Sequence, residues 1–255
     1  MEGQWDVRLL LLEGPTDISF FVPLFKKIYE FREAPKDLYG RIPIGKSFEN
    51  SQNLLSRPIC LVKNNQAVVL FYVGGKKKLS QALKLVISSL DIWEENFRPG
   101  IIGVARDMDT NQDVLEWAKS ILRDFLPVRE GNSLLVTTQG RRIRVIPFAV
   151  GNVMFGHPNI EEKRELELLL TKLAGSESTL TKFSRSIKAL NEDKGSKLTP
   201  KDVMHVLAIA KNFGSDRLSG LYKNFVWELI QNQYDIFVDV LRESGVMDFL
   251  EQLTR

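Results

Sequence analysis

Short apolar runs alternate with amphipathic segments along the first 150 residues. The run at 7–12 (VRLLLL) is nearly continuous and stops at Glu13-Gly14-Pro15, which is typical of a buried parallel strand leading into a helix. Further strand patterns lie at 59–62, 67–73, 100–105, 134–137 and 143–148, and helical spacing recurs at 18–28, 76–96 and 114–125. This alternation predicts an α/β domain with a mostly parallel sheet flanked by helices.

After residue 158 only helical patterns remain. They cover 160–173, 180–190, 200–212, 221–241 and 246–253. Glycines at 175 and 195 separate the first three, and Thr199-Pro200 is a good helix start. We therefore expect an α/β domain over residues 1–152, followed by an all-α helical domain over 153–255.

The composition of the 255 residues removes several classes of protein. Apolar residues make up 44% and charged residues 26% of the chain, as in ordinary globular proteins. No apolar run approaches the roughly 18 residues of a membrane span, and the first residues are acidic and polar, unlike a signal peptide. These features predict a soluble, cytoplasmic protein with no membrane partner.

Charge and ligand types narrow the chemistry further. The 35 Lys and Arg residues exceed the 32 Asp and Glu residues by only three, so a nucleic acid would have to be bound locally rather than by a basic coat. One cysteine, Cys60, and two histidines, His157 and His205, cannot form a zinc site. Metal chemistry would therefore use oxygen ligands, which suit Mg²⁺ or Mn²⁺.

Carboxylates follow two of the expected buried strands. Glu13 comes after the run at 7–12, and Asp107 and Asp109 come after the run at 100–105. Active sites in open parallel sheets lie at the carboxyl ends of strands. Carboxylates 4–6 Å apart at an effective dielectric of about 20 repel by roughly 3–4 kcal/mol. Three such carboxylates therefore need a bound cation or a raised pKa, and we predict that Glu13, Asp107 and Asp109 bind one or two Mg²⁺ or Mn²⁺ ions.

A glycine pair followed by lysines is a second candidate feature. Gly74 and Gly75 end a predicted strand, and Lys76 opens a helix with two further lysines. Cations at a helix N-terminus are unfavourable by roughly 0.3–1 kcal/mol each, so the run suggests a phosphate contact, with a solvated surface run as the alternative. Arg106, beside the acid pair, is a candidate counter-ion or phosphate ligand.

The run LLLLEGPTD at 9–17, with GVARDMDT at 103–110, resembles the Toprim (topoisomerase-primase) domain over roughly residues 5–150. The signature of that domain is a Glu-Gly after the first strand and an Asp-x-Asp after a later one. Glu13 and Gly14 match the first part, and Asp107 and Asp109 match the second. The EGxxD form, which adds Asp17, is similar to small archaeal and phage Toprim proteins and to overcoming-lysogenization-defect nucleases. The acidic helix start at Glu165 and Glu167 more loosely resembles an element of those proteins.

The resemblance implies metal-dependent phosphoryl transfer on DNA or RNA, with a nuclease of nucleic-acid processing or repair as the leading hypothesis. It implies catalytic roles for Glu13, Asp107, Asp109 and Lys76, metal binding by the three acids with Asp17, and a further metal ligand at Glu165 or Glu167. The chain departs from the compact members of the family because it has an insert at 34–66.

Two alternatives stay open. The chain could be a non-catalytic subunit that binds metal and nucleic acid, with a protein partner or a second copy of itself. The run DMDT at 107–110 also resembles haloacid-dehalogenase-like phosphatases. In that family the motif normally lies near the N-terminus and is followed by another acidic strand end, and this chain shows neither feature.

Overall fold

A computed structural model of the chain describes residues 4–43, 55–108, 113–175, 189, 192–193, 197–210 and 218–255. The chain divides into two compact units. The first comprises Met1–Arg106, Gln112–Phe148 and Phe249–Arg255, and the second comprises Asp107–Asn111 and Ala149–Asp248. Asp107, the last residue of a strand, therefore belongs to the second unit.

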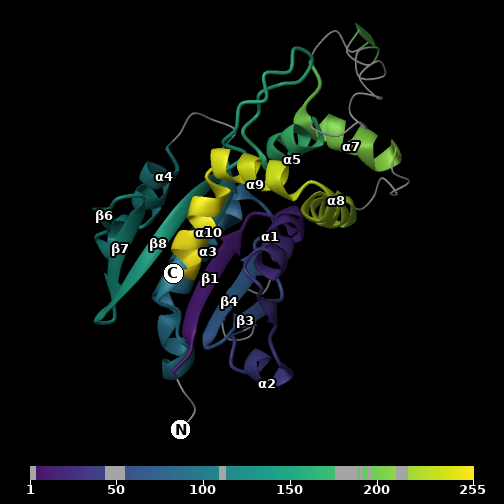
Figure 1. Cartoon of the computed structure of the whole chain (residues 1–255). Helices are drawn as coiled ribbons and strands as arrows, with labels where there is room; N and C mark the ends of the chain where they lie inside the picture. The colour runs from purple at the N-terminus through teal and green to yellow at the C-terminus, as the bar shows by residue number, and fades with distance from the viewer. Residues whose placement is uncertain are drawn as a thin grey trace. The chain divides into compact units, whose positions relative to one another are not determined.

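An eight-stranded sheet organises the α/β part of the chain (Figure 1). Its strands, in spatial order, are β2 (Arg32–Glu33), β3 (Ile59–Lys63), β4 (Gln66–Tyr72), β1 (Asp6–Leu12), β5 (Ile101–Asp107), β8 (Arg141–Val150), β7 (Ser133–Thr138) and β6 (Val128–Glu130). β1 pairs in parallel with β4 and β5, whereas the pairs β2–β3, β3–β4, β6–β7 and β7–β8 are antiparallel. The expected α/β class is confirmed, with a mixed sheet whose parallel pairs lie at its centre.

Helices cover both faces of this sheet in the first unit. Their bounds are α1 (Pro15–Lys27), α2 (Lys36–Tyr39), α3 (Lys76–Ser88), α4 (Val114–Ile121) and α10 (Val246–Thr254), with single turns of 3₁₀-helix at Leu90–Ile92, Glu95–Phe97 and Arg123–Phe125. Leu9 and Leu11 share a core with α3 and α4. Because side chains alternate along a strand, Leu10 points the other way, towards Phe249 of α10 and Gly103. The continuous apolar pattern of β1 follows from burial on both faces.

The last helix packs with the α/β unit rather than with the other helices of the C-terminal half. Phe249 stacks on Phe148 with ring centroids 4.6 Å apart and makes an edge contact with Phe21 at 6.2 Å. A Cβ at Gly103 would lie 3.0 Å from the Phe249 ring, so the glycine gives the helix room to approach β5. Residues 249–255 therefore lie outside the helical unit, although the helical pattern continues to the end of the chain.

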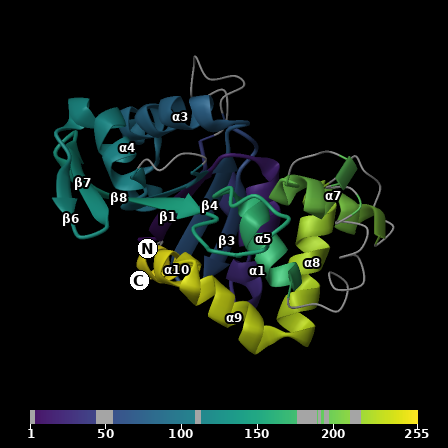
Figure 2. The same ribbon diagram turned by 90° about the horizontal axis from the view of Figure 1, so that it is seen from above.

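The second unit consists mainly of four described helices: α5 (Leu166–Gly175), α7 (Pro200–Ala210), α8 (Leu218–Asn232) and α9 (Tyr234–Glu243). α5 contacts α7 and α9, and α8 contacts α7 and α9 (Figure 2). The single helix expected over 221–241 is divided at Gln233, and the helix expected over 180–190 lies outside the described residues, apart from residue 189. Within the described part of the chain, every helix is too short or too polar to cross a membrane.

Candidate metal centre

The end of β5 is joined to the start of α5 by backbone and side-chain hydrogen bonds. The N–H of Met108 donates to the carbonyl oxygen of Arg164 at 2.8 Å, forming an isolated antiparallel bridge. The N–H of Leu166, the first residue of α5, donates to Oδ1 of Asp107 at 3.0 Å. Asp107 therefore satisfies one of the four N–H groups that a helix leaves unbonded at its N-terminus.

Gly151 lets the segment before α5 lie against the end of β8. Its φ of +73° belongs to the left-handed region, and a Cβ built on it would lie only 2.0 Å from the carbonyl oxygen of Glu165. Any larger residue would have to displace that backbone. The placement of Glu165 thus depends on a glycine fourteen positions earlier in the chain.

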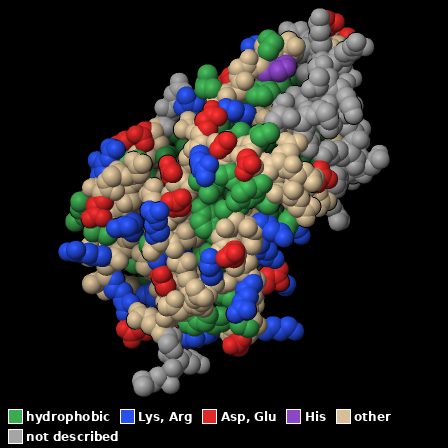
Figure 3. Space-filling view, viewed as in Figure 1, with side chains coloured by type: hydrophobic (Ala, Val, Ile, Leu, Met, Phe, Trp, Pro, Cys, Tyr) green, Lys and Arg blue, Asp and Glu red, His purple; other side chains and the backbone are tan. Residues whose placement is uncertain are grey.

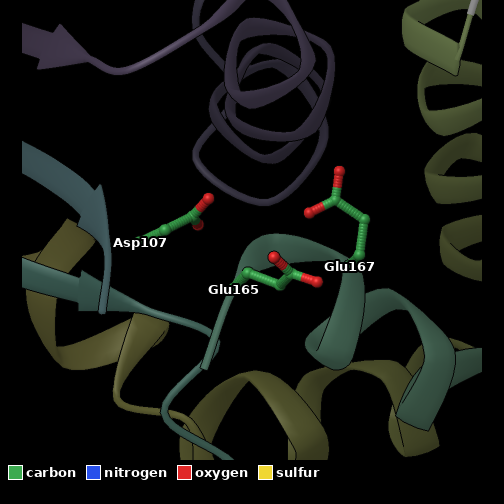
Figure 4. A group of neighbouring side chains, drawn as sticks. All are labelled: Asp107, Glu165 and Glu167. Carbon is green, nitrogen blue, oxygen red and sulfur yellow. The ribbon is translucent and has the colours of Figure 1, made fainter. Parts of the chain in front are cut away.

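These contacts bring three carboxylates together. Asp107, Glu165 and Glu167 each offer an oxygen, and the three oxygens lie within 4.8 Å of one another. Asp107 comes from the end of β5, Glu165 from the segment before α5, and Glu167 from its first turn, and the side chains surround a common space (Figure 4). Asp107 and Glu165 are half-buried, and Glu167 is 7% exposed. All three belong to the second unit.

The proximity of three carboxylates has an electrostatic cost. At 4.8 Å and an effective dielectric of about 20, each pair of ionised carboxylates repels by roughly 3 kcal/mol. The N-terminal dipole of α5 offsets only about 0.3–1 kcal/mol per acid. A cation bound between the three oxygens would relieve this repulsion. Oxygen-only ligands of this kind suit Mg²⁺ or Mn²⁺.

Glu167 is tied to the core of the helical unit by Tyr222 of α8. The Tyr222 hydroxyl donates to Oε1 of Glu167 at 3.0 Å, and Tyr222 is fully buried. Burial raises the pKa of Tyr222 well above its usual range, and the charge and hydrogen bond of Glu167 and the charges of Glu165 and Asp107 raise it further. The phenol therefore remains a neutral hydrogen-bond donor at ordinary pH.

The other predicted residues group around the end of β1 in the first unit. Glu13 follows β1 and is half-buried, and its carbonyl oxygen accepts a hydrogen bond from the N–H of Gly75 at 2.9 Å. Gly74 and Gly75 have φ angles of +71° and +124°, which explains the glycine pair. Lys76 is the first residue of α3. The structure brings the Glu13 and Gly75 backbones together, and the roles of Glu13 and Lys76 in catalysis stay predictions.

Asp17 has a structural role at the start of α1. Its Oδ2 accepts a hydrogen bond from the N–H of Gly14, the N-cap residue, at 2.8 Å, and the side chain is 4% exposed. This is half of a capping box, in which the third helical residue bonds back to the N-cap backbone. The EGxxD form is thus explained locally by helix capping, and a metal role for Asp17 stays a prediction.

The two remaining predictions lie next to Asp107 in sequence. The guanidinium of Arg106 lies over the Trp117 ring, 4.5 Å from its centroid, so a cation–π contact accounts for part of its environment. Asp109 lies outside the described residues. The second acid of the Asp-x-Asp motif therefore stays a prediction, as does the role of Arg106 as a counter-ion.

Two residues that support the cluster were not identified from the sequence. Tyr222 lies 55 positions from Glu167 on another helix, where a tyrosine at an apolar position looks like an ordinary core residue. Gly151 directly follows a predicted strand, where a glycine usually marks only a turn. The sequence does carry one signal that Glu167 has a buried partner. Glu167 is flanked by leucines on an apolar face, where a carboxylate needs a hydrogen-bond donor or a cation.

The sheet, the helical unit and the acid cluster define the class of protein: an α/β protein with a candidate metal centre. The chain belongs to the family described as "Protein of unknown function (DUF3226)", whose model matches residues 7–245. It is 38% identical over 232 residues to an uncharacterized protein of Methanocaldococcus jannaschii, covering 89% of this chain and 92% of that protein. It is similar to the crystal structure of a hypothetical protein from Pyrococcus horikoshii, with a TM-score of 0.83 and 36% identity over 98% of this chain and 100% of the other.

Proposed function

We propose that this protein is a Mg²⁺- or Mn²⁺-dependent enzyme of phosphoryl transfer on nucleic acid, most simply a nuclease of the Toprim type. The observation that carries the proposal is the cluster of Asp107, Glu165 and Glu167, whose oxygens lie within 4.8 Å of one another. The sequence adds the Glu-Gly and Asp-x-Asp motifs, which motivate the Toprim assignment.

The three carboxylates would hold the ion, and a bound Mg²⁺ or Mn²⁺ would supply Lewis acidity and charge neutralisation at a phosphoryl oxygen. Asp107 is set for this role by its bond to the α5 backbone, and Glu167 by its bond to Tyr222. The roles of Lys76 and Glu13, which belong to the first unit, stay predictions from the sequence: a cation that offsets charge on a phosphate, and a metal ligand or acid/base group.

The distribution of surface charge favours a local contact with nucleic acid over a broad basic interface. On the face drawn in Figure 3, Lys and Arg side chains are interspersed with Asp and Glu. The net charge of +3 agrees with this mixture. A phosphodiester would therefore be recognised through a metal ion and a few nearby cations rather than by a large positive field.

The direct test uses pure full-length protein with single- and double-stranded DNA and RNA, with and without Mn²⁺. We expect cleavage that requires metal and that falls at least about 100-fold in Asp107→Ala, because an ion missing one of its carboxylate ligands binds poorly. The matched control is Asp91→Ala, which removes an exposed aspartate in the first unit. Equal cleavage by wild type and Asp107→Ala would show that the activity does not use this cluster.

A second candidate function is metal binding without catalysis. The specific observation in its favour is that Asp107 caps α5, so an ion held by the cluster would fasten the end of β5 to the start of that helix. Calorimetry that shows Mn²⁺ binding by a protein inactive on every nucleic acid would support this reading. The phosphatase alternative depends on Asp109, outside the described residues, and has no further observation behind it.

A further inference from the structure

We propose that Tyr222 is a positioning residue that holds Glu167 as a one-oxygen metal ligand and thereby makes the cluster prefer Mn²⁺ and Mg²⁺ over Ca²⁺. This inference rests on the proposed metal site. It assigns a function to a buried polar pair that the phosphoryl-transfer chemistry does not itself require.

Glu167 and Tyr222 form a buried polar pair. Tyr222 is 0% exposed and Glu167 is 7% exposed. The hydroxyl of Tyr222 donates to Oε1 of Glu167 at 3.0 Å, and among the described residues this is the one hydrogen bond to the Glu167 side chain. A glutamate with this degree of burial and a single neutral donor is poorly compensated, which is the situation that a cation at its other oxygen would relieve.

The bond from Tyr222 also limits how the Glu167 carboxylate can turn. The hydrogen bond to Oε1 restricts the rotation of the carboxylate, and Oε2 is the oxygen left to meet an ion. The carboxylates of Asp107, Glu165 and Glu167 face the same space in Figure 4. Partners that orient metal-binding side chains in this way commonly change metal affinity 10–100-fold when they are removed.

Mg²⁺ and Ca²⁺ differ in how they coordinate carboxylates. Mg²⁺ requires near-octahedral geometry and takes one oxygen from each carboxylate, together with water, whereas Ca²⁺ accepts more ligands and often binds both oxygens of a carboxylate. A glutamate that offers one oxygen suits the smaller ion. Removing the Tyr222 hydroxyl would allow Glu167 to turn and present both oxygens, which would favour Ca²⁺.

The experiment compares Mn²⁺ and Ca²⁺ binding by calorimetry in wild type and Tyr222→Phe. We expect the substitution to weaken Mn²⁺ binding about 10-fold or more and to weaken Ca²⁺ binding less, so that the preference for Mn²⁺ falls by a similar factor. A substitution that only loosened the fold would weaken both ions alike. Tyr234→Phe is the matched control, because Tyr234 belongs to the same unit and is 46% exposed.

The outcomes separate this inference from the function on which it rests. If wild type binds neither ion, the metal site itself is wrong and both proposals fall. If Asp107→Ala loses Mn²⁺ binding but Tyr222→Phe keeps the wild-type ratio of Mn²⁺ to Ca²⁺ affinity, the site stands and the role of Tyr222 is refuted.

A second measurement covers the case in which Tyr222→Phe does not fold. Wild-type protein labelled with 3-fluorotyrosine carries five fluorine probes, because the chain has five tyrosines. Saturating Mg²⁺ should shift one resonance, and Glu167→Gln, which keeps a hydrogen-bond acceptor for Tyr222, should abolish that shift. An unchanged spectrum in wild type at saturating Mg²⁺ would contradict the inference.

Discussion

Helices α1 and α5 both begin beside a carboxylate that accepts a backbone hydrogen bond, and the two starts differ in what else is present. At α1, Asp17 bonds to Gly14 three residues away. At α5, Asp107 bonds to Leu166 across 59 residues, and two further acids, Glu165 and Glu167, lie within 4.8 Å. The first arrangement is a helix cap with one acid. The second holds more negative charge than capping requires, and this excess distinguishes a candidate metal centre from a structural motif.

The largest effect should come from removing an acid at α5. We expect Glu167→Gln to weaken Mn²⁺ binding at least about 100-fold, because a ligand charge is lost at a buried position. The side chain keeps nearly the same shape and an oxygen that can accept from Tyr222, so circular dichroism should be unchanged. Wild-type affinity in titration calorimetry would show that Glu167 is only a buried structural residue.

The next effect should come from Gly151. Alanine at this position would place a Cβ 2.0 Å from the Glu165 carbonyl oxygen at a φ of +73°, so the backbone that carries Glu165 must move. We expect Mn²⁺ affinity to fall about 10-fold or more and the free energy of unfolding to fall by about 2–4 kcal/mol. Gly220→Ala is the control, because nothing lies within 4 Å of its added Cβ. If both variants behave alike, the close approach at Gly151 is unimportant.

A third effect concerns stability with and without the ion. At a free Mn²⁺ concentration 100 times the dissociation constant, binding to the folded state alone adds about 2.7 kcal/mol to the free energy of unfolding. Wild type should therefore unfold at a higher temperature in Mn²⁺ than in EDTA, whereas Glu165→Gln should show a smaller difference. An equal increase in both proteins would place the stabilising ion elsewhere.

The smallest effect should come from α1. Asp17→Ala removes the hydrogen bond from Gly14, and the loss of such a cap costs about 1 kcal/mol of stability, which urea unfolding can measure. Because the bond is local, we expect no change in Mn²⁺ affinity. A loss of affinity as large as that of Asp107→Ala would erase the contrast between the two helix starts and support the predicted metal role of Asp17.

The α/β part of the fold was largely predictable because its signals are local. The apolar run at β1, the turn at Asn64-Asn65 between β3 and β4, and the glycines after β4 each fix the backbone within a few residues. The division of the helical pattern at Gln233 and the return of Phe249 to the sheet were not predictable, because both depend on packing between segments far apart in the chain.

The candidate site likewise has parts that the sequence predicts and parts that only the folded structure shows. Asp107 could be identified from its place after a buried strand, and Glu165 and Glu167 were weaker candidates from an acidic helix start. Their convergence depends on the Met108–Arg164 bridge and on Gly151, and the orientation of Glu167 depends on Tyr222. Those contacts join positions tens of residues apart, and periodicity along one chain carries no information about them.

The central claim, that Asp107, Glu165 and Glu167 form a cation site, is tested most directly by a crystal structure determined in saturating Mn²⁺ with anomalous diffraction. We expect an anomalous peak surrounded by oxygens of these three side chains. A well-ordered structure at saturating Mn²⁺ with no peak there, or with its strongest peak at a site that lacks all three, would contradict it.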